Sequence, residues 1–457
     1  MQKIPFDKIA FVLSLTAFAF LYGFAASTRG WFPNDLLVAA WRQARAIWTQ
    51  ANATDKMPRL DYIQDRIYDR AGVRIEEPQN IQPGMTLILS LWKEFDWKPG
   101  AKLIDVNGRM LHAWEVDGDQ LFPDPPKHRT KRDPNRTNIH GAYLFANGDI
   151  VVNLSYVGAV RLDPCGRLLW QIPAGNHHSI ARADDGSFWI TGGSWDPPEQ
   201  RSGQSMTLPG LDERVYHDRI LHVSEAGEVL NELDVLDVLY ANGLQRYIPK
   251  GSAYPPPSMP DDITHLNDVE PLEASMAGEY PLFASGDLLI SIHHLDLVLV
   301  LDPRSKQVKW HASEPFIQQH DPDFWGSGWI GVFDNNRDGT RRGTMLGGSR
   351  IVLLQPHTDS LKIIFPTELS EPFYTKVQGE WQQLENGNLL LTESQAGRVV
   401  EVAPDGRTVW EWVAEPYKET GVPEVTDATR HDLTYQQVEA WPCSPEESTG
   451  NREEPES

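Results

Sequence analysis

Cysteine is nearly absent from this chain: only Cys165 and Cys443 occur among 457 residues. Two cysteines exclude a disulfide framework and a zinc site of the CxxC kind. They leave open either one long-range disulfide in an oxidising compartment or two free thiols. The sequence also lacks a GxSxG nucleophile turn and a phosphate-cradling glycine loop. It therefore carries no motif of the enzyme classes that use them, and we expect no cofactor.

Positive charge is also scarce. Lys and Arg number 41 against 64 Asp and Glu, which gives a formal net charge of −23. Nucleic acids and anionic membrane surfaces are bound through basic patches, so neither is expected as the main partner. An anionic substrate would need a local island of positive charge in so acidic a protein.

The N-terminal hydrophobic run is long enough to cross a bilayer as a helix. No charged residue occurs from Ile9 to Ser27, and Lys3 and Lys8 precede the run. About 20 apolar residues span the hydrocarbon core, whereas the core of a secretory signal has about 7–15. We predict an uncleaved transmembrane anchor in residues 1–30, with the rest of the chain on the exported, periplasmic or extracellular side. Small residues at Gly23–Ala25 leave cleavage as the alternative.

The remaining chain falls into three segments that differ in their sequence pattern. Residues 31–80 show a helical period of apolar side chains that opens at Asn34, which predicts a short helical stalk or clasp. Residues 81–415 consist of short runs in which apolar and polar residues alternate, separated by Gly, Asp and Asn turns. This pattern is typical of β-strands. Residues 416–457 are expected to form a C-terminal extension with a disordered acidic tail.

One strand-and-turn pattern recurs six times between residues 81 and 415. The copies begin at Met85, Asn147, Asp185, Ser285, Ser327 and Asn386. A spacing of about 40 residues where loops are short is typical of four-stranded propeller blades. The sequence therefore predicts an all-β fold, a six-bladed β-propeller; one or two β-sandwiches are the alternative. Insertions at 195–216 and 241–280 should lie on one face and shape a site.

Histidines recur at one position of these copies. His140, His178 and His320 each lie eight residues before a turn glycine. The intervening segment is the first strand of a blade, which lines the central channel of a propeller. Equal offsets predict equal height on that channel, so we expect these imidazoles to share one mouth. The fourth copy has His265 at its head, and the sixth has Gly379 at the same offset, which leaves space for a ligand.

A ring of imidazoles suits two kinds of chemistry. Three or four of them can bind a transition metal, or they can act as acid, base and nucleophile around an anion. For any single histidine at a strand start, capping of backbone amides is the structural alternative.

The order of the motifs resembles that of the arylsulfotransferase family over residues 84 to 415. The motifs are NHHSI, HLNDVEPL, GDLLIS, QHDPDF, FDN and LENGNLLLTESQAGRVVEVAPDGRTVWEWV. The resemblance implies a six-bladed propeller with its active site in the central channel. It also implies transfer of a sulfuryl group from a phenolic sulfate ester to a phenol acceptor through a sulfohistidine, without a nucleotide donor.

The resemblance also implies roles for single residues. The nucleophile falls on His320 and the supporting histidines fall on His178 and His265, one of which also protonates the leaving phenolate. We assign substrate binding to four further residues and expect no metal ligand. These residues are His140, His293, Asn267 and Gln319.

One position departs from the family pattern. His293 stands where the family usually has an arginine. Arginine gives a permanent fork of donors to sulfate oxygens, whereas histidine gives a single donor that titrates.

Three other functions fit parts of the sequence. A non-catalytic scaffold or binding module would keep the propeller without the arginine. A metal-dependent esterase would use His140, His178 and His320 as ligands. A quinone-dependent dehydrogenase is suggested by outer-strand tryptophans, but it needs more blades and a calcium site of carboxylates. These tryptophans are Trp170, Trp310 and Trp410.

Overall fold

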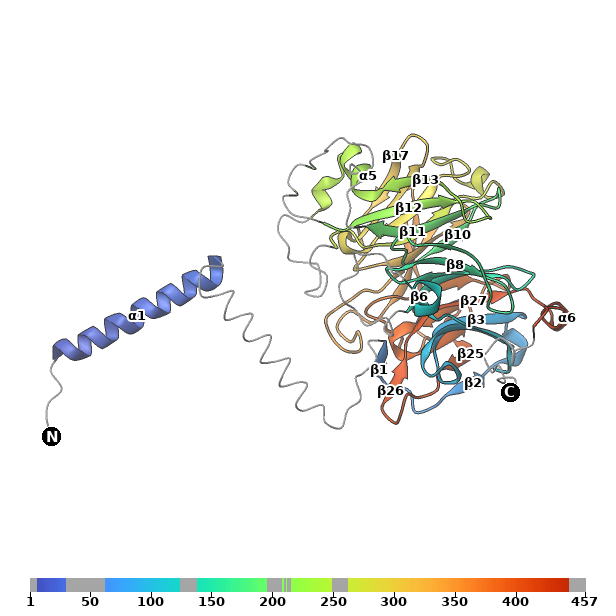
Figure 1. The fold of residues 1–457 in the computed structure, drawn as a ribbon, viewed down its shortest axis with the longest axis horizontal. Helices are drawn as coiled ribbons and strands as arrows, with labels where there is room; N and C mark the ends of the chain where they lie inside the picture. The colour runs from blue at the N-terminus through green and yellow to red at the C-terminus, as the bar shows by residue number, and fades with distance from the viewer. Residues whose placement is uncertain are drawn as a thin grey trace. The chain divides into compact units, whose positions relative to one another are not determined.

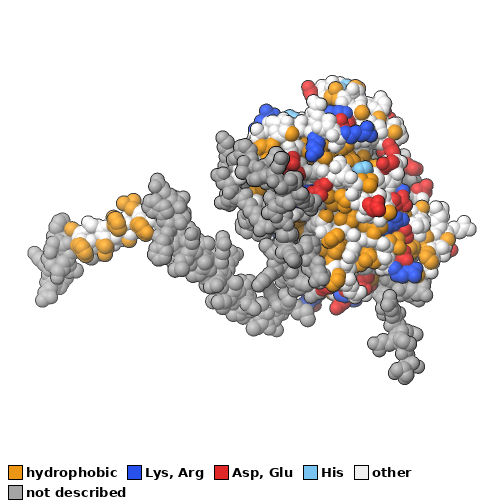
Figure 2. Space-filling view, turned by 45° about the horizontal axis from the view of Figure 1, so that its top comes forward, with side chains coloured by type: hydrophobic (Ala, Val, Ile, Leu, Met, Phe, Trp, Pro, Cys, Tyr) orange, Lys and Arg blue, Asp and Glu red, His pale blue; other side chains and the backbone are white. Residues whose placement is uncertain are grey.

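The structure is a computed structural model that describes residues 6–29, 62–123, 138–194, 208, 211, 215–248 and 262–443. The chain divides into two units, Met1–Asp61 and Tyr62–Ser457. In the first unit the described element is helix α1 (Phe6–Arg29), on which Phe11, Phe18, Phe20 and Phe24 are exposed. Figure 2 shows hydrophobic side chains along the described part of this helix. Within the described ranges, no helix combines the length and the apolarity needed to cross a membrane, so the expected anchor is not confirmed.

The second unit is a β-propeller of six blades, which confirms the predicted fold (Figure 1). Each blade is an antiparallel sheet with its innermost strand on the central channel. The first blade contains β27 (Val425–His431), β3 (Met85–Trp92), β4 (Lys98–Ile104) and β5 (Met110–Glu115). The second blade contains β6 (Ile139–Leu144), β7 (Ile150–Leu154), β8 (Gly158–Leu162) and β9 (Leu168–Ile172). The third blade contains β10 (Ile180–Arg182), β11 (Phe188–Ser194), β12 (His217–Val223) and β13 (Val229–Asp234). The fourth blade contains β14 (Leu266–Pro271), β15 (Leu288–Ile292), β16 (Leu297–Asp302) and β17 (Gln307–Ala312). The fifth blade contains β18 (His320–Gly326), β19 (Trp329–Asp334), β20 (Arg350–Gln355) and β21 (Ser360–Phe365). The sixth blade contains β22 (Trp381–Gln383), β23 (Leu389–Glu393), β24 (Arg398–Val402), β25 (Thr408–Val413) and β2 (Gly72–Ile75).

The hydrophobic core lies between blades. Six clusters of buried side chains occur, and each joins one pair of adjacent blades. Successive side chains of a strand point to opposite faces of its sheet. Because both faces of a blade are covered by neighbours, middle strands such as β3 and β16 are apolar along most of their length.

The propeller is closed by strands from both ends of this unit. Strand β27 follows the sixth blade in sequence and supplies the innermost strand of the first, pairing with β3. The propeller therefore extends beyond residue 415, the predicted boundary. Strand β2 pairs with β25 and adds a fifth strand to the sixth blade. Closure by a distant segment removes the free edges that an open sheet would expose.

The predicted helical stalk is wrong where the structure tests it. Residues 31–61 of the stalk lie outside the described residues, as does the acidic tail from Ser444. From Tyr62 onward the chain forms β1 (Ile63–Asp65), which pairs with β26 (Gly421–Pro423), and then β2. The helical periodicity of this segment is overruled because its backbone pairs with strands of the propeller.

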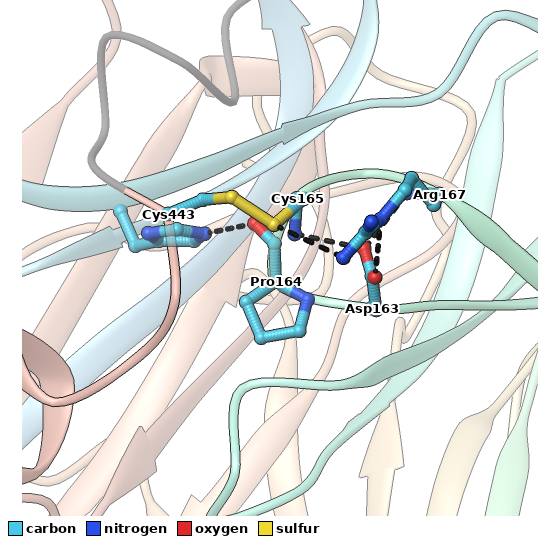
Figure 3. Close-up of a disulfide and its surroundings, with 6 residues drawn as sticks. Asp163, Pro164, Cys165, Arg167 and Cys443 are labelled. Carbon is cyan, nitrogen blue, oxygen red and sulfur yellow. Dashed lines mark hydrogen bonds and ion pairs between the residues drawn. A yellow bond between two sulfur atoms is a disulfide. The ribbon is translucent and has the colours of Figure 1, made fainter.

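A disulfide joins Cys165 to Cys443, 278 residues apart, and decides between the two alternatives left open by the sequence. Figure 3 shows Cys165 in the Asp163–Arg167 turn between β8 and β9. Cys443 follows helix α6 (Tyr435–Glu439), which packs through Val438 on the interface of the first two blades. The disulfide therefore ties the segment after the closing strand to the second blade.

Replacing Cys443 by serine should lower the free energy of unfolding by about 2–4 kcal/mol, because the unfolded chain regains the freedom of a long loop. Urea denaturation under non-reducing conditions measures the change. Cys165→Ser should give the same loss, and the double variant should lose no more than either single variant. Equal unfolding midpoints for the native protein and these variants would contradict a stabilising disulfide.

Candidate functional site

A small cavity lies where the starts of the innermost strands meet. It is lined by all six blades through His140, Gly141, His178, Ser179, Asn267, Asp268, His320, Asp321, Gln378, Gly379, Glu380 and Thr426. Its volume of about 20 Å³ holds a water molecule. A whole aryl ester does not fit in that volume, so its binding requires the lining side chains to move apart.

The structure brings together the histidines that share one offset in the sequence. The ring centroids of His140 and His178 lie 4.3 Å apart, and those of His178 and His320 lie 6.3 Å apart. His265 and His293 adjoin this group, with His293 4.6 Å from His320 between centroids. The five imidazoles form one continuous cluster, which we call the histidine ring.

His320 begins β18 and is held as a neutral imidazole of defined tautomer. Its Nδ1 lies 2.6 Å from Oδ1 of Asn335. The Nδ2 of Asn335 donates to the carbonyl oxygens of Thr375 and Gln378, so the oxygen must face His320 and Nδ1 must carry the hydrogen. The lone pair therefore lies on Nε2, where it accepts from the Gln378 N–H at 3.2 Å.

Burial lowers the pKa of His320 to about 3. The hydrogen bond from Nδ1 to Asn335 acts in the opposite direction but is the smaller effect. The imidazole is therefore uncharged at neutral pH, and its Nε2 lone pair is available to an electrophile. The long hydrogen bond from Gln378 is the one contact that an electrophile would have to displace.

His265 is the member of the ring whose surroundings favour the charged form. Its Nδ1 donates to Oδ2 of Asp262 at 2.6 Å. Burial opposes the charge, but the carboxylate of Asp262, through its charge and this hydrogen bond, raises the pKa of His265 above its ordinary value. In turn His265 lowers the pKa of Asp262 to about 2, although burial opposes this. The Nε2 of His265 lies 3.1 Å from Nε2 of His178, and the charged form of His265 donates a hydrogen bond to it.

The other ring members are neutral. Burial lowers the pKa of His140 to about 3, and burial also lowers the pKa values of His178 and His293. No lysine or arginine is among the residues lining the cavity. Among the ring members, His265, paired with the carboxylate of Asp262, is therefore the one best suited to hold a positive charge, and it contacts the cavity residue His178.

Backbone strain is concentrated at this site. His178, His265, Asp321 and Gln378 all have φ between +45° and +59°, the left-handed region that non-glycine residues rarely adopt. Such conformations cost of order 1–3 kcal/mol each and cluster at functional sites. Gly379 has φ +110°, and a Cβ there would lie 2.4 Å from the Phe333 ring. The sequence analysis expects glycine at this position to leave space for a ligand. The contact with Phe333 is a second reason for glycine there.

The two polar residues assigned to substrate binding differ in placement. The Nδ2 of Asn267 donates to the Gln319 carbonyl oxygen, and its Oδ1 has no hydrogen-bond partner at the cavity. The side chain of Gln319 donates to Ser291 inside the fourth blade and does not line the cavity. His293 faces the same carbonyl oxygen of Gln319 through its Nδ1, at 3.3 Å.

Asp262 and Asn335 are functional residues that the sequence analysis missed. Asp262 lies three residues before His265, and Asn335 is the last residue of the FDN motif. Their proximity to recognised motifs is the feature that points to them. Asp268, Asp321 and Glu380 were also missed, although two of them lie inside the HLNDVEPL and QHDPDF motifs.

One group of residues in the described chain has the spacing of a metal site. Ligand atoms of Asp262, His265 and His294 lie within 4.8 Å of one another. Their Nδ1 atoms are already engaged, because Nδ1 of His265 bonds the Asp262 carboxylate and Nδ1 of His294 bonds the Asp262 carbonyl oxygen. The group that a metal-dependent esterase would use, His140, His178 and His320, does not meet this spacing.

Replacing Asp262 by asparagine should lower the pKa of His265 below the ordinary imidazole value, because burial then acts without the opposing carboxylate. In the native protein His265 stays charged until the pH rises through its raised pKa, so charge is lost on the alkaline side. NMR titration of the imidazole resonances measures both values, with His265→Gln identifying the signal. An unchanged titration in Asp262→Asn would contradict the ion pair.

Comparisons with known proteins identify one family. The family model described as arylsulfotransferase (ASST) matches residues 141–415. No curated protein matches the chain. Among solved structures, a protein of unknown function from Bacteroides caccae is 14% identical, with 76% of this chain and 98% of that chain covered and a TM-score of 0.47.

Two lyases are also similar. A streptogramin B lyase is 11% identical, with 79% of this chain and 98% of that one covered and a TM-score of 0.38. A virginiamycin B lyase from Staphylococcus aureus is 9% identical, with 65% and 86% covered and a TM-score of 0.34. At these scores the structural likenesses carry no argument about function.

Proposed function

Because this chain belongs to the arylsulfotransferase family, we propose that it transfers a sulfuryl group from a phenolic sulfate ester to a phenol acceptor. His320 is the nucleophile, and the intermediate is a sulfohistidine. The observation that carries this proposal is the uncharged imidazole of His320, whose Nε2 accepts one long hydrogen bond from the Gln378 N–H and whose side chain lines a cavity together with His140 and His178.

In the first step the Nε2 lone pair of His320 attacks sulfur as the bond between sulfur and the aryl oxygen breaks. Negative charge then develops on the sulfonate oxygens and the leaving oxygen. His178 and His140 lie close enough to the cavity to meet those oxygens. The positive charge of His265 acts on these oxygens across its contact with His178. Such electrostatic stabilisation is strongest where water is excluded.

The second step repeats the first with a phenol as the nucleophile. The acceptor oxygen attacks sulfur, the bond between nitrogen and sulfur breaks, and the electron pair returns to Nε2 of His320. Donor and acceptor use the same cavity in turn, so ping-pong kinetics follow.

His293 changes the conditions under which this site binds an anion. An arginine would stay charged at every pH, whereas burial keeps His293 neutral at neutral pH. Donor binding therefore depends on His265, and it should weaken as the pH rises through the raised pKa of that residue.

Incubation of the purified protein with a chromogenic aryl sulfate tests the proposal. Release of the chromophore that requires a phenol acceptor, with a sulfated acceptor as product, supports transfer. Release without an acceptor indicates a sulfatase. No release from any donor across acidic and neutral pH would sink the proposal.

A non-catalytic binding module is the second candidate. It is favoured by the small volume of the cavity and by the absence of arginine from its lining. It would retain binding of an aryl sulfate, measured by calorimetry, without turnover.

The location of the protein also belongs to the proposal. The disulfide between Cys165 and Cys443 supports an oxidising compartment on the exported side. The uncharged run from Ile9 to Ser27 supports attachment to a membrane through the N-terminal helix. Fractionation of the source cells, with and without alkaline extraction, tests both.

A further inference from the structure

Carboxyl groups face the nucleophile across the cavity. Asp268, Asp321 and Glu380 line it together with His320. Asp321 directly follows His320, and its Oδ2 accepts the backbone N–H of Trp381 at 2.7 Å. That hydrogen bond ties the Asp321 carboxyl group to the residue next to Glu380, so the two carboxyl groups are neighbours at the cavity. Two neighbouring buried carboxyl groups without a cation between them cannot both ionise, so one of them keeps a proton.

We propose that Asp321 and Glu380 form a proton-sharing carboxyl pair that protonates the leaving phenolate and later takes the proton of the phenol acceptor. This inference rests on the proposed function. It gives the acid and base roles to carboxyl groups, in place of the histidine that the sequence analysis expects.

Orphaned acceptor atoms at the same cavity point independently to a ligand that brings an O–H group. The side chain of Asn267 is 5% exposed, and its Oδ1 has no hydrogen-bond partner because Nδ2 is the atom bound to Gln319. Oε1 of Gln378, another lining residue, also has no partner. A sulfonate offers only acceptor oxygens, so it cannot satisfy these atoms. A phenol hydroxyl can, beside the carboxyl pair.

The surroundings favour the protonated form of the pair. Burial and the nearby charges of Asp323 and Asp427 raise the pKa of Asp321, against the Trp381 N–H, which lowers it. Burial and the charges of Asp321, Asp427, Asp268 and Asp323 raise the pKa of Glu380. Carboxyl groups crowded in a space without a cation keep protons at neutral pH.

The histidines are less suited to supply this proton. His140, His178, His293 and His320 are neutral, and Nδ1 of His320 is committed to Asn335. The imidazolium of His265 does not line the cavity, and its two N–H groups bond Asp262 and His178. The proton available beside the reacting oxygen is therefore the one between Asp321 and Glu380.

The charges and atoms balance in each step. As Nε2 of His320 bonds to sulfur, the aryl oxygen leaves with its electron pair and takes the proton of the pair, which releases a neutral phenol. The pair becomes two carboxylates while the adjacent His320 ring becomes a cation, and this new charge offsets their repulsion. In the second step one carboxylate takes the acceptor's proton as the acceptor oxygen attacks sulfur.

A series of aryl sulfates with leaving phenols of decreasing acidity tests the proposal. Glu380→Gln keeps the size of the side chain but has no proton to transfer. For electron-rich phenols, single-turnover sulfuryl transfer to His320 should slow by about 10²–10³-fold. For 4-nitrophenyl sulfate, whose phenolate leaves without help, the loss should be under about tenfold. Asp321→Asn should show the same dependence on the leaving group.

Glu368→Gln is the matched control, because Glu368 is exposed and does not line the cavity, and the substitution removes the same type of side chain. It should change all donors by one small common factor. If Glu380→Gln slows every donor equally, or slows none, the carboxyl pair is not the acid and the inference is overturned. Circular dichroism and thermal melting check that each variant is folded.

Infrared spectroscopy separates this inference from the proposed function. The carbonyl band of a protonated carboxyl group at neutral pH should be present in the native protein and weaker in Glu380→Gln. If no donor reacts with the native protein, the proposed function fails, and the loss of this band still supports the shared proton. A spectrum without a band that depends on Glu380 would overturn it.

Discussion

Replacing His320 by asparagine is expected to reduce kcat/KM for sulfuryl transfer from an aryl sulfate by at least about 10⁴-fold, because a nucleophile is lost outright. An amide nitrogen has no basic lone pair with which to form the bond to sulfur. Other groups of the site cannot replace it, since His140 and His178 are held by different strands and face the cavity from other blades. Binding of the donor should survive in part.

The intermediate can be observed directly. Native protein incubated with a donor in the absence of acceptor should gain the mass of one sulfuryl group, and His320→Asn should gain none. His311→Asn is the matched control, because His311 lies on the outer strand β17 and packs against Tyr247. It should retain native activity. Full transfer by His320→Asn would show that another residue is the nucleophile.

Replacing Arg398 by methionine is expected to lower the free energy of unfolding by about 3–5 kcal/mol, the cost of removing one partner from a buried ion pair. Arg398 is 1% exposed and bonds Glu411 at 2.7 Å and Glu393 at 3.4 Å. It also donates to the hydroxyl of Tyr68 at 3.2 Å. Tyr68 lies between β1 and β2, so this network fastens the N-terminal strands of the propeller to the sixth blade.

The carboxylates explain the size of that effect. Without Arg398, the side chain of Glu393 keeps the Tyr68 hydroxyl and the Tyr374 N–H but loses its ion pair, whereas Glu411 keeps Arg70. Burial already raises the pKa of Glu393, so an unpaired carboxylate there should take up a proton at higher pH. The loss of stability should therefore be smaller in acid than at neutral pH.

Arg407→Met is the matched control. Arg407 pairs with Asp405 at 2.9 Å and with Glu77 at 2.6 Å, but its own side chain is 51% exposed. Exposed ion pairs contribute little to stability, so the control should lose far less than Arg398→Met. Urea denaturation followed by tryptophan fluorescence measures both variants. Equal losses for Arg398→Met and Arg407→Met would contradict the role of burial.

The sequence predicts the blades better than it predicts their closure. Repeated copies appear in the chain as local patterns of apolar residues and turn glycines, which are legible without knowing the partners of each strand. Strands β27 and β2 pair with segments far away in sequence. Their local patterns are short, and one of them has helical periodicity, so only the paired structure identifies them.

The alternation of side chains along a strand explains one misplaced residue. Gln319 precedes His320, and neighbouring side chains of an extended chain point to opposite sides. The amide of Gln319 accordingly lies inside the fourth blade near Ser291, whereas His320 lines the cavity. The assignment of Gln319 to substrate binding followed its position in the motif and ignored this alternation.

The sequence by itself determined the six-bladed fold and the shared height of His140, His178 and His320, because both depend on a periodic pattern along the chain, and its motifs indicated the family. Only the tertiary structure decided which ring nitrogen of His320 bears the lone pair, which imidazole is paired with a carboxylate and which carboxyl groups line the cavity. Those properties depend on contacts with Asn335 and Asp262 and on the strands that bring Asp321 and Glu380 beside His320. Burial and hydrogen bonds set a proton's position, and both arise only where distant strands meet around the channel.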